Sequence, residues 1–255
     1  MPSKELMKKL YEIGAIKFGE FTLKSGKKSP YYVDLRILSS FPDVLREAGR
    51  VMGDMILRDS ERPEVLCGVP AAGLAIANAI SFHTNIPAVY TRKEPIIYSK
   101  LSDHLRGLLK AGEQEEMVPD ERPGIERAIE IIDSLGGLKG HGIPRYVDGE
   151  SEDGARIGIV DDVIATAESK LEARDLVLLE AKRRNSKVKV VGVYVLLDRE
   201  QGGRESLQRG GLRLCPVATI RECARSLREL GTLSVEMYDT IVDYTVADRK
   251  AVGLE

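Results

Sequence analysis

Short apolar runs alternate with stretches of helical periodicity along most of the chain. Apolar residues at helical spacing run from Asp43 to Leu57 and again from about Ser169 to Arg184. Runs with the length and β-branched content of strands are EVLCGV, PAVYTR, RIGIVDDV, KVKVVGVYVLLD and LRLCPVATI. Strands that alternate with helices in this way are typical of a mostly parallel sheet covered on both faces. The pattern predicts the α/β class, with residues 1–255 forming a single domain.

The N-terminal part of the chain carries a different pattern. Ser3 is placed to cap a first helix, and Gly14 is placed to end it. The segment FGEFTLKSGKKSPYYVDLR then alternates as two paired strands do, around the turn SGKKSP. We therefore expect a helix and a hairpin before the α/β part begins.

A stretch of 43 residues, Ile96 to Leu138, interrupts the alternation. It contains two helix-like pieces, SKLSDHLRGLLKAG and PGIERAIEIIDSLGG, joined by the acidic segment EQEEMVPDER. Its 5 Lys and Arg residues against 9 Asp and Glu residues give a net charge of −4. Pro123 suits the first turn of the second helix, and Gly136 suits its end. We interpret the stretch as a helical hairpin inserted in a loop; the alternative is decoration that merely lengthens the loop.

Two adjacent carboxylates, Asp161 and Asp162, end the strand IGIVDD and are followed by the small residues of VIATAES. Ligands of open α/β sheets bind outside the carboxyl ends of the strands, beside the N-termini of the following helices. Carboxylates accept hydrogen bonds from ribose hydroxyls and helix N–H groups bind phosphate, so the stretch suits a sugar diphosphate. Neighbouring strand residues point to opposite sides, so at most one aspartate should face into the sheet. The alternative is an ordinary strand end with a solvated aspartate and a helix cap.

Basic residues in the predicted loops and at strand ends support a polyanionic ligand. They are Lys24, Arg92, Lys93 and Lys139, together with His141. Arginine gives a diphosphate bidentate contacts, and lysine gives it a point charge. We interpret His83 and His104 instead as helix-surface or packing residues. The loop GVPAAG, between a strand and a helix, has small residues that allow either close approach to a ligand or tight strand–helix packing.

Composition narrows the functional classes. The formal net charge of −2 over 255 residues gives no basic field for nucleic acid. No apolar run is long enough for a membrane span, and the N-terminus lacks the apolar core of a signal peptide. The 3 cysteines are too few for a disulfide framework and fit no metal site, so we expect a soluble cytoplasmic protein. The absence of GxGxxG after a strand and of GxxxxGK[ST] disfavours dinucleotide and P-loop sites.

These segments together resemble a known family. FGEFTLKSGKKSPYYVDLR, CGVPAAG, YTRKE, KGHG, IVDDVIATAES and VLLDREQGG occur in the order expected of orotate phosphoribosyltransferases. The resemblance covers nearly the whole chain apart from residues 96–138. It implies a phosphoribosyltransferase-type sheet with flanking helices, a small N-terminal hood and a helical hairpin inserted in the catalytic loop. It also implies transfer of the 5-phosphoribosyl group from 5-phosphoribosyl 1-diphosphate to N1 of orotate, in pyrimidine biosynthesis, with Mg²⁺ bound on the donor.

The resemblance assigns residues to the acceptor side and to the mobile loop. Tyr32 and Val33 match the pair that lies along orotate in the family. Arg199, in VLLDREQGG, matches the residue that binds the orotate carboxylate. Lys139 and His141 match catalytic-loop residues that reach the active site of the neighbouring subunit. The resemblance therefore implies a homodimer with shared active sites.

The donor side is assigned in the same way. Lys24 matches a donor-binding lysine, and Arg92 with Lys93 matches the pair that binds pyrophosphate. Asp161 and Asp162 would hold the ribose hydroxyls and would belong, with Lys93 and the loop residues, to the catalytic set. The loop that follows would bind substrate through Val163, Ile164, Ala165, Thr166, Ala167, Glu168 and Ser169.

Several of the matched positions depart from the family's pattern. Ala71 and Ala72 are substrate-binding positions where the family often has a tyrosine and a lysine that touch the donor. Ala165 removes a hydroxyl that commonly meets orotate, and Ala167 replaces a glycine. Glu168 places a carboxylate where the 5′-phosphate is expected. Two alternatives therefore stand beside the enzyme: a ligand sensor or regulator with little catalysis, and a purine-type phosphoribosyltransferase that uses the same donor loop.

Overall fold

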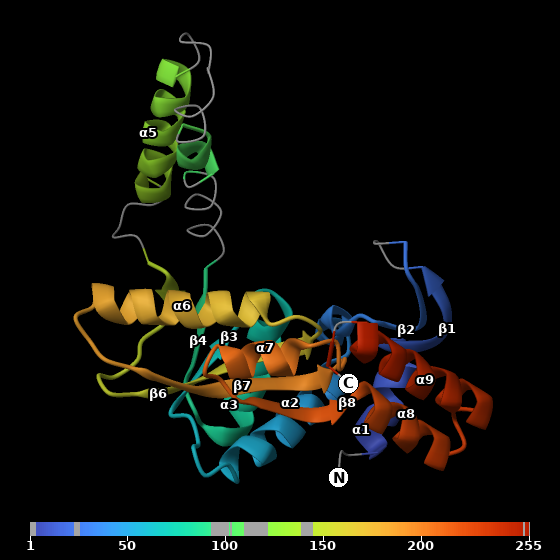
Figure 1. Cartoon of the computed structure of the whole chain (residues 1–255). Coiled ribbons are helices and arrows are strands. Elements are labelled where there is room, and N and C mark those ends of the chain that lie inside the picture. The colour runs from blue at the N-terminus through green and yellow to red at the C-terminus, as the bar shows by residue number, and fades with distance from the viewer. Residues whose placement is uncertain are drawn as a thin grey trace. The chain divides into compact units, whose positions relative to one another are not determined.

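The computed structural model describes residues 4–22, 26–92, 102, 104–109, 122–138, 145–251 and 253–254 (Figure 1). The chain forms two compact units. The first comprises Met1–Tyr90 together with Gly149–Glu255, and the second comprises Thr91–Asp148. The interpretation of the chain as one domain with an insert over residues 96–138 stays a prediction.

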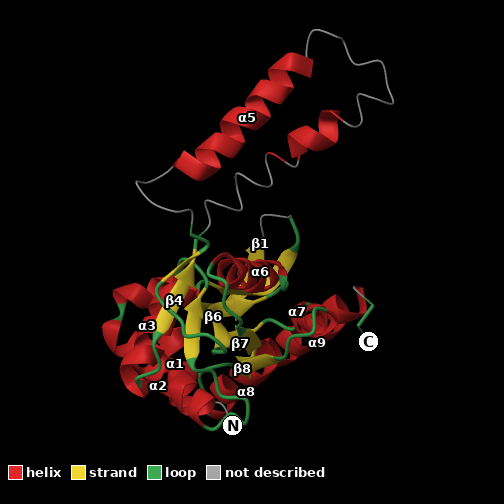
Figure 2. Cartoon of the chain, turned by 90° about the vertical axis from the view of Figure 1, so that its left-hand side faces the viewer, coloured by secondary structure: helices red, strands yellow, loops and turns green. Residues whose placement is uncertain are grey.

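The first unit is built on a sheet whose neighbouring strands run parallel (Figure 2). In spatial order the strands are β4 (Ala88–Thr91), β3 (Val65–Gly68), β6 (Arg156–Ile164), β7 (Lys189–Asp198) and β8 (Leu214–Thr219). β6 and β7 are buried along most of their length, as expected of strands with helices on both faces. The strands coincide with the apolar runs of the sequence, β6 extending one residue beyond RIGIVDDV, so the predicted mostly parallel sheet is confirmed.

Apolar clusters on the two faces of the sheet show which helices cover it. On one face, Val160 of β6 packs in a cluster with residues of α2 (Pro42–Leu57) and α3 (Ala72–Thr84). On the other face, Ile159 packs with residues of α6 (Glu168–Arg183) and α7 (Gly203–Arg209). Successive residues of β6 thus enter opposite clusters, as the two-residue period of a strand requires. Figure 1 shows α6 and α2 on opposite sides of the sheet.

The N-terminal elements form the predicted helix and hairpin. α1 (Lys4–Glu12) is followed by β1 (Ile16–Thr22) and β2 (Lys28–Val33), which pair antiparallel. A short 3₁₀ helix, η1 (Leu35–Ser40), then leads to α2 and contacts β6. The chain order of these elements follows directly from the turn SGKKSP and from the alternation on either side of it.

Two C-terminal helices pack against the N-terminal elements. α8 (Ile220–Glu229) begins with a capping box, in which Thr219 and Glu222 each accept a hydrogen bond from the other's backbone N–H. It contacts α1. α9 (Val235–Ala251) packs on β2, where the rings of Tyr31 and Tyr244 meet edge to face at 5.8 Å between centroids.

The second unit contains α5 (Arg122–Leu138), a short helical stretch over residues 104–109 and β5 (Val147–Asp148). α5 has Pro123 in its first turn, as the sequence predicts. Most of the acidic segment EQEEMVPDER lies outside the described residues.

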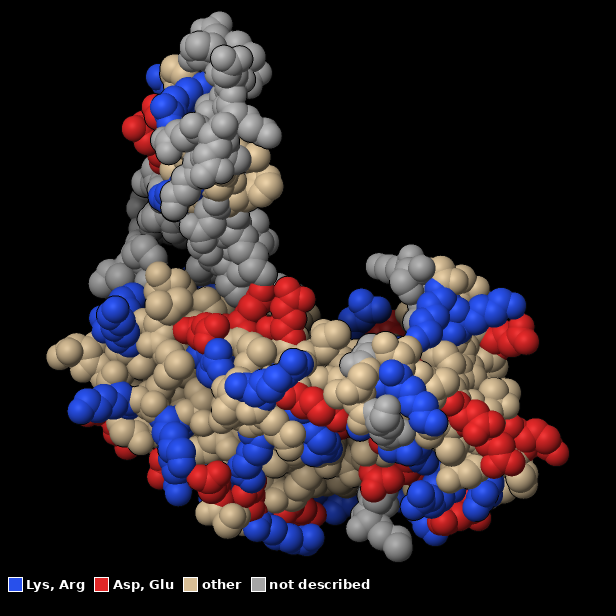
Figure 3. Space-filling model, in the orientation of Figure 1, with Lys and Arg blue, Asp and Glu red and all other residues tan. Residues whose placement is uncertain are grey.

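Two features of the structure concern surface charge and membrane spans. On the face shown in Figure 3, basic and acidic side chains are interspersed over the first unit, in keeping with a formal net charge of −2. Within the described part of the chain, no helix has both the length and the apolar content that crossing a membrane needs.

Candidate active site

The carboxyl ends of the central strands lie at different heights on one edge of the sheet. Gly68, the last residue of β3, pairs with Val160 of β6. Ile164, the last residue of β6, pairs with Asp198, the last residue of β7. β6 therefore extends four residues, 161–164, beyond the end of β3. The two aspartates stand at this step in the sheet edge, where a ligand can approach from the β3 side.

Both aspartates are buried, Asp161 with 6% and Asp162 with 8% of its surface exposed. Burial of both is compatible with side chains that point to opposite sides of the strand, so the expectation that at most one of them faces into the sheet stays a prediction. Asp161 forms an ion pair with Lys170 of α6, with 2.7 Å between Oδ2 and Nζ. Asp162 accepts a hydrogen bond on Oδ1 from the N–H of Val163 at 2.8 Å. The alternative of an ordinary strand end with a solvated aspartate is wrong, because neither aspartate is solvated.

The environment of Asp162 favours its neutral form. Burial raises the pKa of the Asp162 carboxyl to about 7, and the neighbouring charge of Asp161 acts in the same direction. The hydrogen bond from Val163 and the charge of Lys170 lower that pKa by less. A carboxyl with a pKa near neutrality changes its charge in the physiological range, which is typical of functional sites.

The loop after β6 leads directly into a helix. α6 begins at Glu168, one residue before the predicted start, and Ala167 is its N-cap residue. Ala167 is buried, whereas the side chains of Thr166, Glu168 and Ser169 are exposed. The N-cap makes no side-chain hydrogen bond to the helix, so the first backbone N–H groups of α6 are not capped from within. Such a helix start favours an anion.

Arg199 lies next to this loop. Its N–H donates to the carbonyl of Ile164 at 2.9 Å, which joins the end of β7 to the end of β6. The guanidinium carbon lies 5.4 Å from the centroid of the Tyr31 ring, and Nε is buried with no hydrogen-bond partner among the described residues. Burial raises the pKa of the Tyr31 hydroxyl to about 12, so that the ring remains neutral beside the guanidinium. A buried guanidinium N–H without an acceptor fits the carboxylate of a ligand.

The comparisons with known proteins decide the family. No family model matches the chain. The orotate phosphoribosyltransferase of Chlamydia caviae is 32% identical over 218 residues, which make up 86% of this chain and 82% of that protein. The chain belongs to the orotate phosphoribosyltransferase family. The resemblance seen in the sequence motifs is thereby confirmed.

Solved structures of this family share the fold. The orotate phosphoribosyltransferase of Aeropyrum pernix superimposes with a TM-score of 0.57 at 26% identity, covering 89% of this chain and 98% of that one. The UMP synthase of Leishmania donovani superimposes with a TM-score of 0.66 at 25% identity, covering 96% of this chain. The chain spans 42% of the length of that UMP synthase. The expected phosphoribosyltransferase-type fold is confirmed.

The loop GVPAAG, between β3 and α3, contributes to packing. A Cβ on Gly73 would lie 2.4 Å from the carbonyl oxygen of Val160 and 3.1 Å from Oδ1 of Asp161. Only glycine lets the start of α3 come this close to the end of β6. Ala71 is the exposed N-cap residue of α3, and Ala72 is partly exposed beside it. The packing explanation holds for Gly73, while the two alanines line the open side of the turn.

The two hairpin residues that the resemblance matches to orotate, Tyr32 and Val33, differ in exposure, because Tyr32 is exposed and Val33 packs partly against the core. Tyr32 is 39% exposed, with its ring 5.8 Å from that of Phe21, and Val33 is partly exposed. Tyr31, which sequence reasoning missed, is fully buried and stands beside Arg199. Alternation along β2 is the signal that distinguishes them, because it turns Tyr31 inward when Tyr32 faces out.

Asp248 on α9 is another residue that the sequence did not single out. Its Oδ2 accepts a hydrogen bond from Nε2 of Gln201 at 2.8 Å, two residues after Arg199. Its Oδ1 pairs with Nζ of Lys27, in the turn of the hairpin. These contacts hold the pKa of the Asp248 carboxyl below its usual range, against the opposing effect of burial. Asp248 thus ties the loop that carries Arg199 to the hairpin.

The basic residues that the sequence predicts around the donor either belong to the second unit or lie outside the described residues. Arg92 lies in the second unit, where its Nε is 3.9 Å from Oδ2 of Asp148 and its N–H donates to the carbonyl of Tyr146 at 3.0 Å. The other predicted basic residues, Lys24, Lys93, Lys139 and His141, lie outside the described residues.

Proposed function

We propose that the protein transfers the 5-phosphoribosyl group from 5-phosphoribosyl 1-diphosphate to N1 of orotate, giving orotidine 5′-phosphate and pyrophosphate. The observation that carries this proposal is the buried Nε of Arg199, which has no acceptor among the described residues and lies next to the Asp161–Asp162 loop in a chain of this family. A carboxylate-binding cation beside a sugar-phosphate loop fits orotate, since purine bases and uracil carry no carboxylate.

The residues at the sheet edge have complementary tasks in this reaction. Bond breaking leaves positive charge on the sugar and negative charge on the leaving pyrophosphate. Carboxylates under the ribose accept hydrogen bonds from its hydroxyls, and the start of α6 holds the 5′-phosphate. Arg199 orients orotate so that N1 faces the anomeric carbon, and orientation of this kind lowers a barrier by several kcal/mol.

A divalent cation is part of the proposal. Within the described residues, no group of three or more His, Cys, Asp or Glu side chains is arranged to hold a metal ion. Mg²⁺ is commonly bound through substrate phosphates with few protein ligands, so we propose that it enters on the diphosphate of the donor. Bound there, it supplies positive charge to the leaving group. Arg92, Lys93, Lys24 and the loop residues Lys139 and His141 are the proposed protein cations around the donor.

An assay with five bases tests the proposed function. The protein is supplied with donor and Mg²⁺ and is offered orotate, uracil, adenine, hypoxanthine and guanine in separate reactions. We expect pyrophosphate release with orotate alone. Turnover of a purine would establish the purine-type alternative, and donor binding without turnover of any base would establish the sensor.

Glu168 is expected to weaken donor binding without abolishing it. Its side chain is exposed at the first position of α6, where a carboxylate also favours the helix dipole. A second anion near the 5′-phosphate costs about 1 kcal/mol at water's dielectric constant and a distance of about 4 Å. Glu168→Gln should therefore tighten donor binding by roughly two- to fivefold in calorimetry. Glu172→Gln, one turn further along α6, is the control, and equal effects of both changes would remove Glu168 from the donor site.

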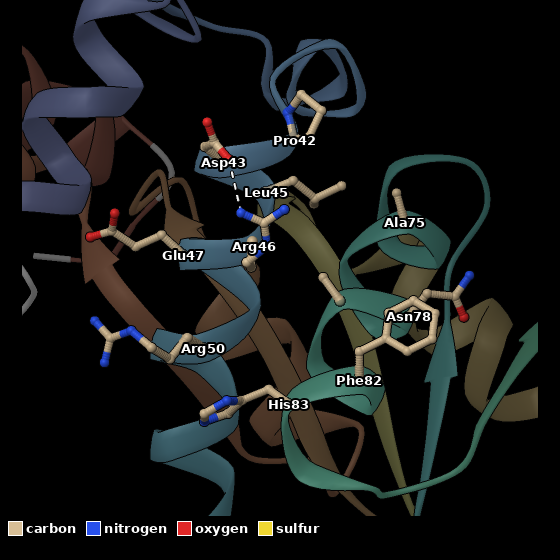
Figure 4. Close-up of a pocket in the computed structure, with 11 residues that line it drawn as sticks. Pro42, Asp43, Leu45, Arg46, Glu47, Arg50, Ala75, Asn78, Phe82 and His83 are labelled. Carbon is tan, nitrogen blue, oxygen red and sulfur yellow. Dashed lines mark hydrogen bonds and ion pairs between the residues drawn. The ribbon is translucent and has the colours of Figure 1, made fainter.

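We propose a homodimer that uses a hollow between α2 and α3. The hollow has a volume of about 980 Å³, and its lining residues come from these two helices (Figure 4). Phe82 lines it with 88% of its surface exposed, beside charged residues of both signs such as Arg46 and Glu47. An apolar centre with mixed charges around it suits the self-complementary patch of a two-fold interface.

Substitution of Phe82 tests this interface. We expect Phe82→Asp to convert the dimer to a monomer in sedimentation at micromolar concentration, because a carboxylate would be buried at the contact. Val235→Asp changes another exposed apolar residue, on α9, and should leave the mass unchanged. A Phe82→Asp protein with the mass of the wild type would place the interface elsewhere.

We propose that residues 96–138 are an insert in the catalytic loop with no part in the core. In support, α5 belongs to the compact unit Thr91–Asp148. Replacing Ile96–Leu138 by two glycines should leave the melting temperature of the sheet unit within about 3 °C of the wild type, which corresponds to roughly 1 kcal/mol. Loss of the cooperative transition on this deletion would show that the insert belongs to the core.

We also propose a cytoplasmic location. The three cysteines, Cys67, Cys215 and Cys223, are free thiols, which suits a reducing compartment.

A further inference from the structure

A buried lysine, Lys170, contacts the first residue of the aspartate pair. Lys170, in the first turn of α6, has only 7% of its side chain exposed. Its Nζ lies 2.7 Å from Oδ2 of Asp161, donates to the carbonyl of Val163 at 2.7 Å and contacts Oγ of Ser169 at 3.2 Å. Lysine is almost never fully buried unless its charge is paired, and here all three ammonium donors have partners.

These contacts make the two aspartates unequal. Asp161 has Oδ2 on Lys170, and its Oδ1 accepts the N–H of Asp162 at 2.9 Å. The start of α3 closes over the same Oδ1, because a Cβ on Gly73 would come within 3.1 Å of it. Both oxygens of Asp161 are thus committed inside the protein, whereas the contact of Asp162 with Val163 uses Oδ1.

We propose that Lys170 is a positioning residue of the reaction assigned above, which anchors Asp161 and the Val163 carbonyl so that Asp162 is the carboxylate presented to the ribose hydroxyls. The inference rests on the proposed function and adds a division of roles within the aspartate pair. Lys170 acts through Asp161 and the strand end, and it does not itself touch the substrate.

The groups around Asp162 come from several elements. α6 contributes Lys170, with the exposed Glu168 at its start, and η1 contributes Arg36, which is held by Asp34 at 2.7 Å. On β7, the residues opposite Asp161 and Val163 are Val195 and Leu197, and the first turn of α3 is uncharged. Lys170 is a cation that lowers the pKa of Asp162. Its removal should therefore raise that pKa and move the acid limb of the activity profile to higher pH.

The test compares three substitutions on α6. Lys170→Met removes the charge at similar length, Lys170→Arg keeps a charge, and Lys182→Met changes an exposed lysine of the same helix. For Lys170→Met we expect kcat/KM for the donor to fall by about a hundredfold, as a misplaced reacting group does. We also expect the acid limb to rise by about one pH unit. Lys170→Arg should recover most of both quantities, and Lys182→Met should match the wild type.

A double variant keeps the test valid if Lys170→Met does not fold. Asp161→Asn with Lys170→Met removes both charges of the buried ion pair and leaves neither partner unpaired, and it should lose no more activity than Asp161→Asn alone, because the lysine acts through that carboxylate. Calorimetry with the donor, in the absence of orotate, compares the same two variants by their donor affinity, independently of catalysis. A wild type that binds donor but does not use orotate would refute the proposed function alone. An unshifted pH profile in Lys170→Met, or a double variant much worse than Asp161→Asn, would overturn the role of Lys170.

Discussion

Arg199→Ala should lower kcat/KM for orotate by roughly 10- to 150-fold, which corresponds to the 1.5–3 kcal/mol of a charge-assisted hydrogen bond. The buried Nε of Arg199 has no acceptor among the described residues, and the neighbouring Tyr31 ring contacts the cation without neutralising it. Orotate's carboxylate would complete this arrangement. Donor affinity should change less than about twofold. Initial-rate kinetics in both substrates and calorimetry with the donor measure the two quantities.

Two further variants are needed: one separates the charge of Arg199 from the shape of its guanidinium, and one is a control at another arginine. Arg199→Lys keeps the charge but loses the planar fork, so its orotate kinetics should fall between those of the wild type and the alanine variant. Arg209→Ala removes an exposed arginine of α7 that hydrogen-bonds Ser206 at 3.0 Å, and it should have no effect. Unchanged orotate kinetics in Arg199→Ala would place the carboxylate elsewhere.

The strands and helices of this site could be predicted from the sequence because local periodicity determines them. The change from a two-residue to a helical period after Ile164 marks the end of β6 and the start of α6, which lies one residue from its predicted position. The aspartates lie near the carboxyl end of the buried strand β6, and Arg199 directly follows the last buried position of β7. Such periodicity and chain order place a residue at a sheet edge without any knowledge of tertiary contacts.

The contacts that set the charge and burial of these residues could not be predicted from the sequence. Lys170 is nine residues from Asp161, and its contact depends on how the first turn of α6 lies against the strand end. Lys27 and Asp248 are 221 positions apart, so only the packing of α9 on the hairpin brings them together. The burial of both aspartates has the same origin, since α6 and η1 cover opposite sides of one strand end. Local propensity contains no information about such coverage.

Asp162→Asn should stabilise the protein at alkaline pH while removing its activity. Between the usual carboxyl pKa near 4 and about 7, the unfolded chain has released the proton of Asp162 and the folded protein retains it, so the free energy of unfolding falls as pH rises. Above pH 7 the folded protein carries the full penalty of a buried charge. Asparagine is neutral at every pH and keeps an oxygen for the N–H of Val163. The melting temperature of the variant should therefore equal that of the wild type near pH 4 and exceed it by roughly 10 °C at pH 8.

Activity should change in the opposite direction, because the ribose hydroxyls need an acceptor and the developing positive charge on the sugar needs a nearby anion. We expect turnover to fall on the order of a hundredfold, the scale seen when one preorganised polar group is removed from an active site. Asp153→Asn, in the loop before β6, is a matched exposed carboxylate whose change should leave both quantities near their wild-type values. A variant that lost activity together with stability at pH 8 would show that Asp162 supports the fold. Lower turnover together with a higher melting temperature at pH 8 would show instead that the strand end keeps a destabilising charge because the reaction needs it.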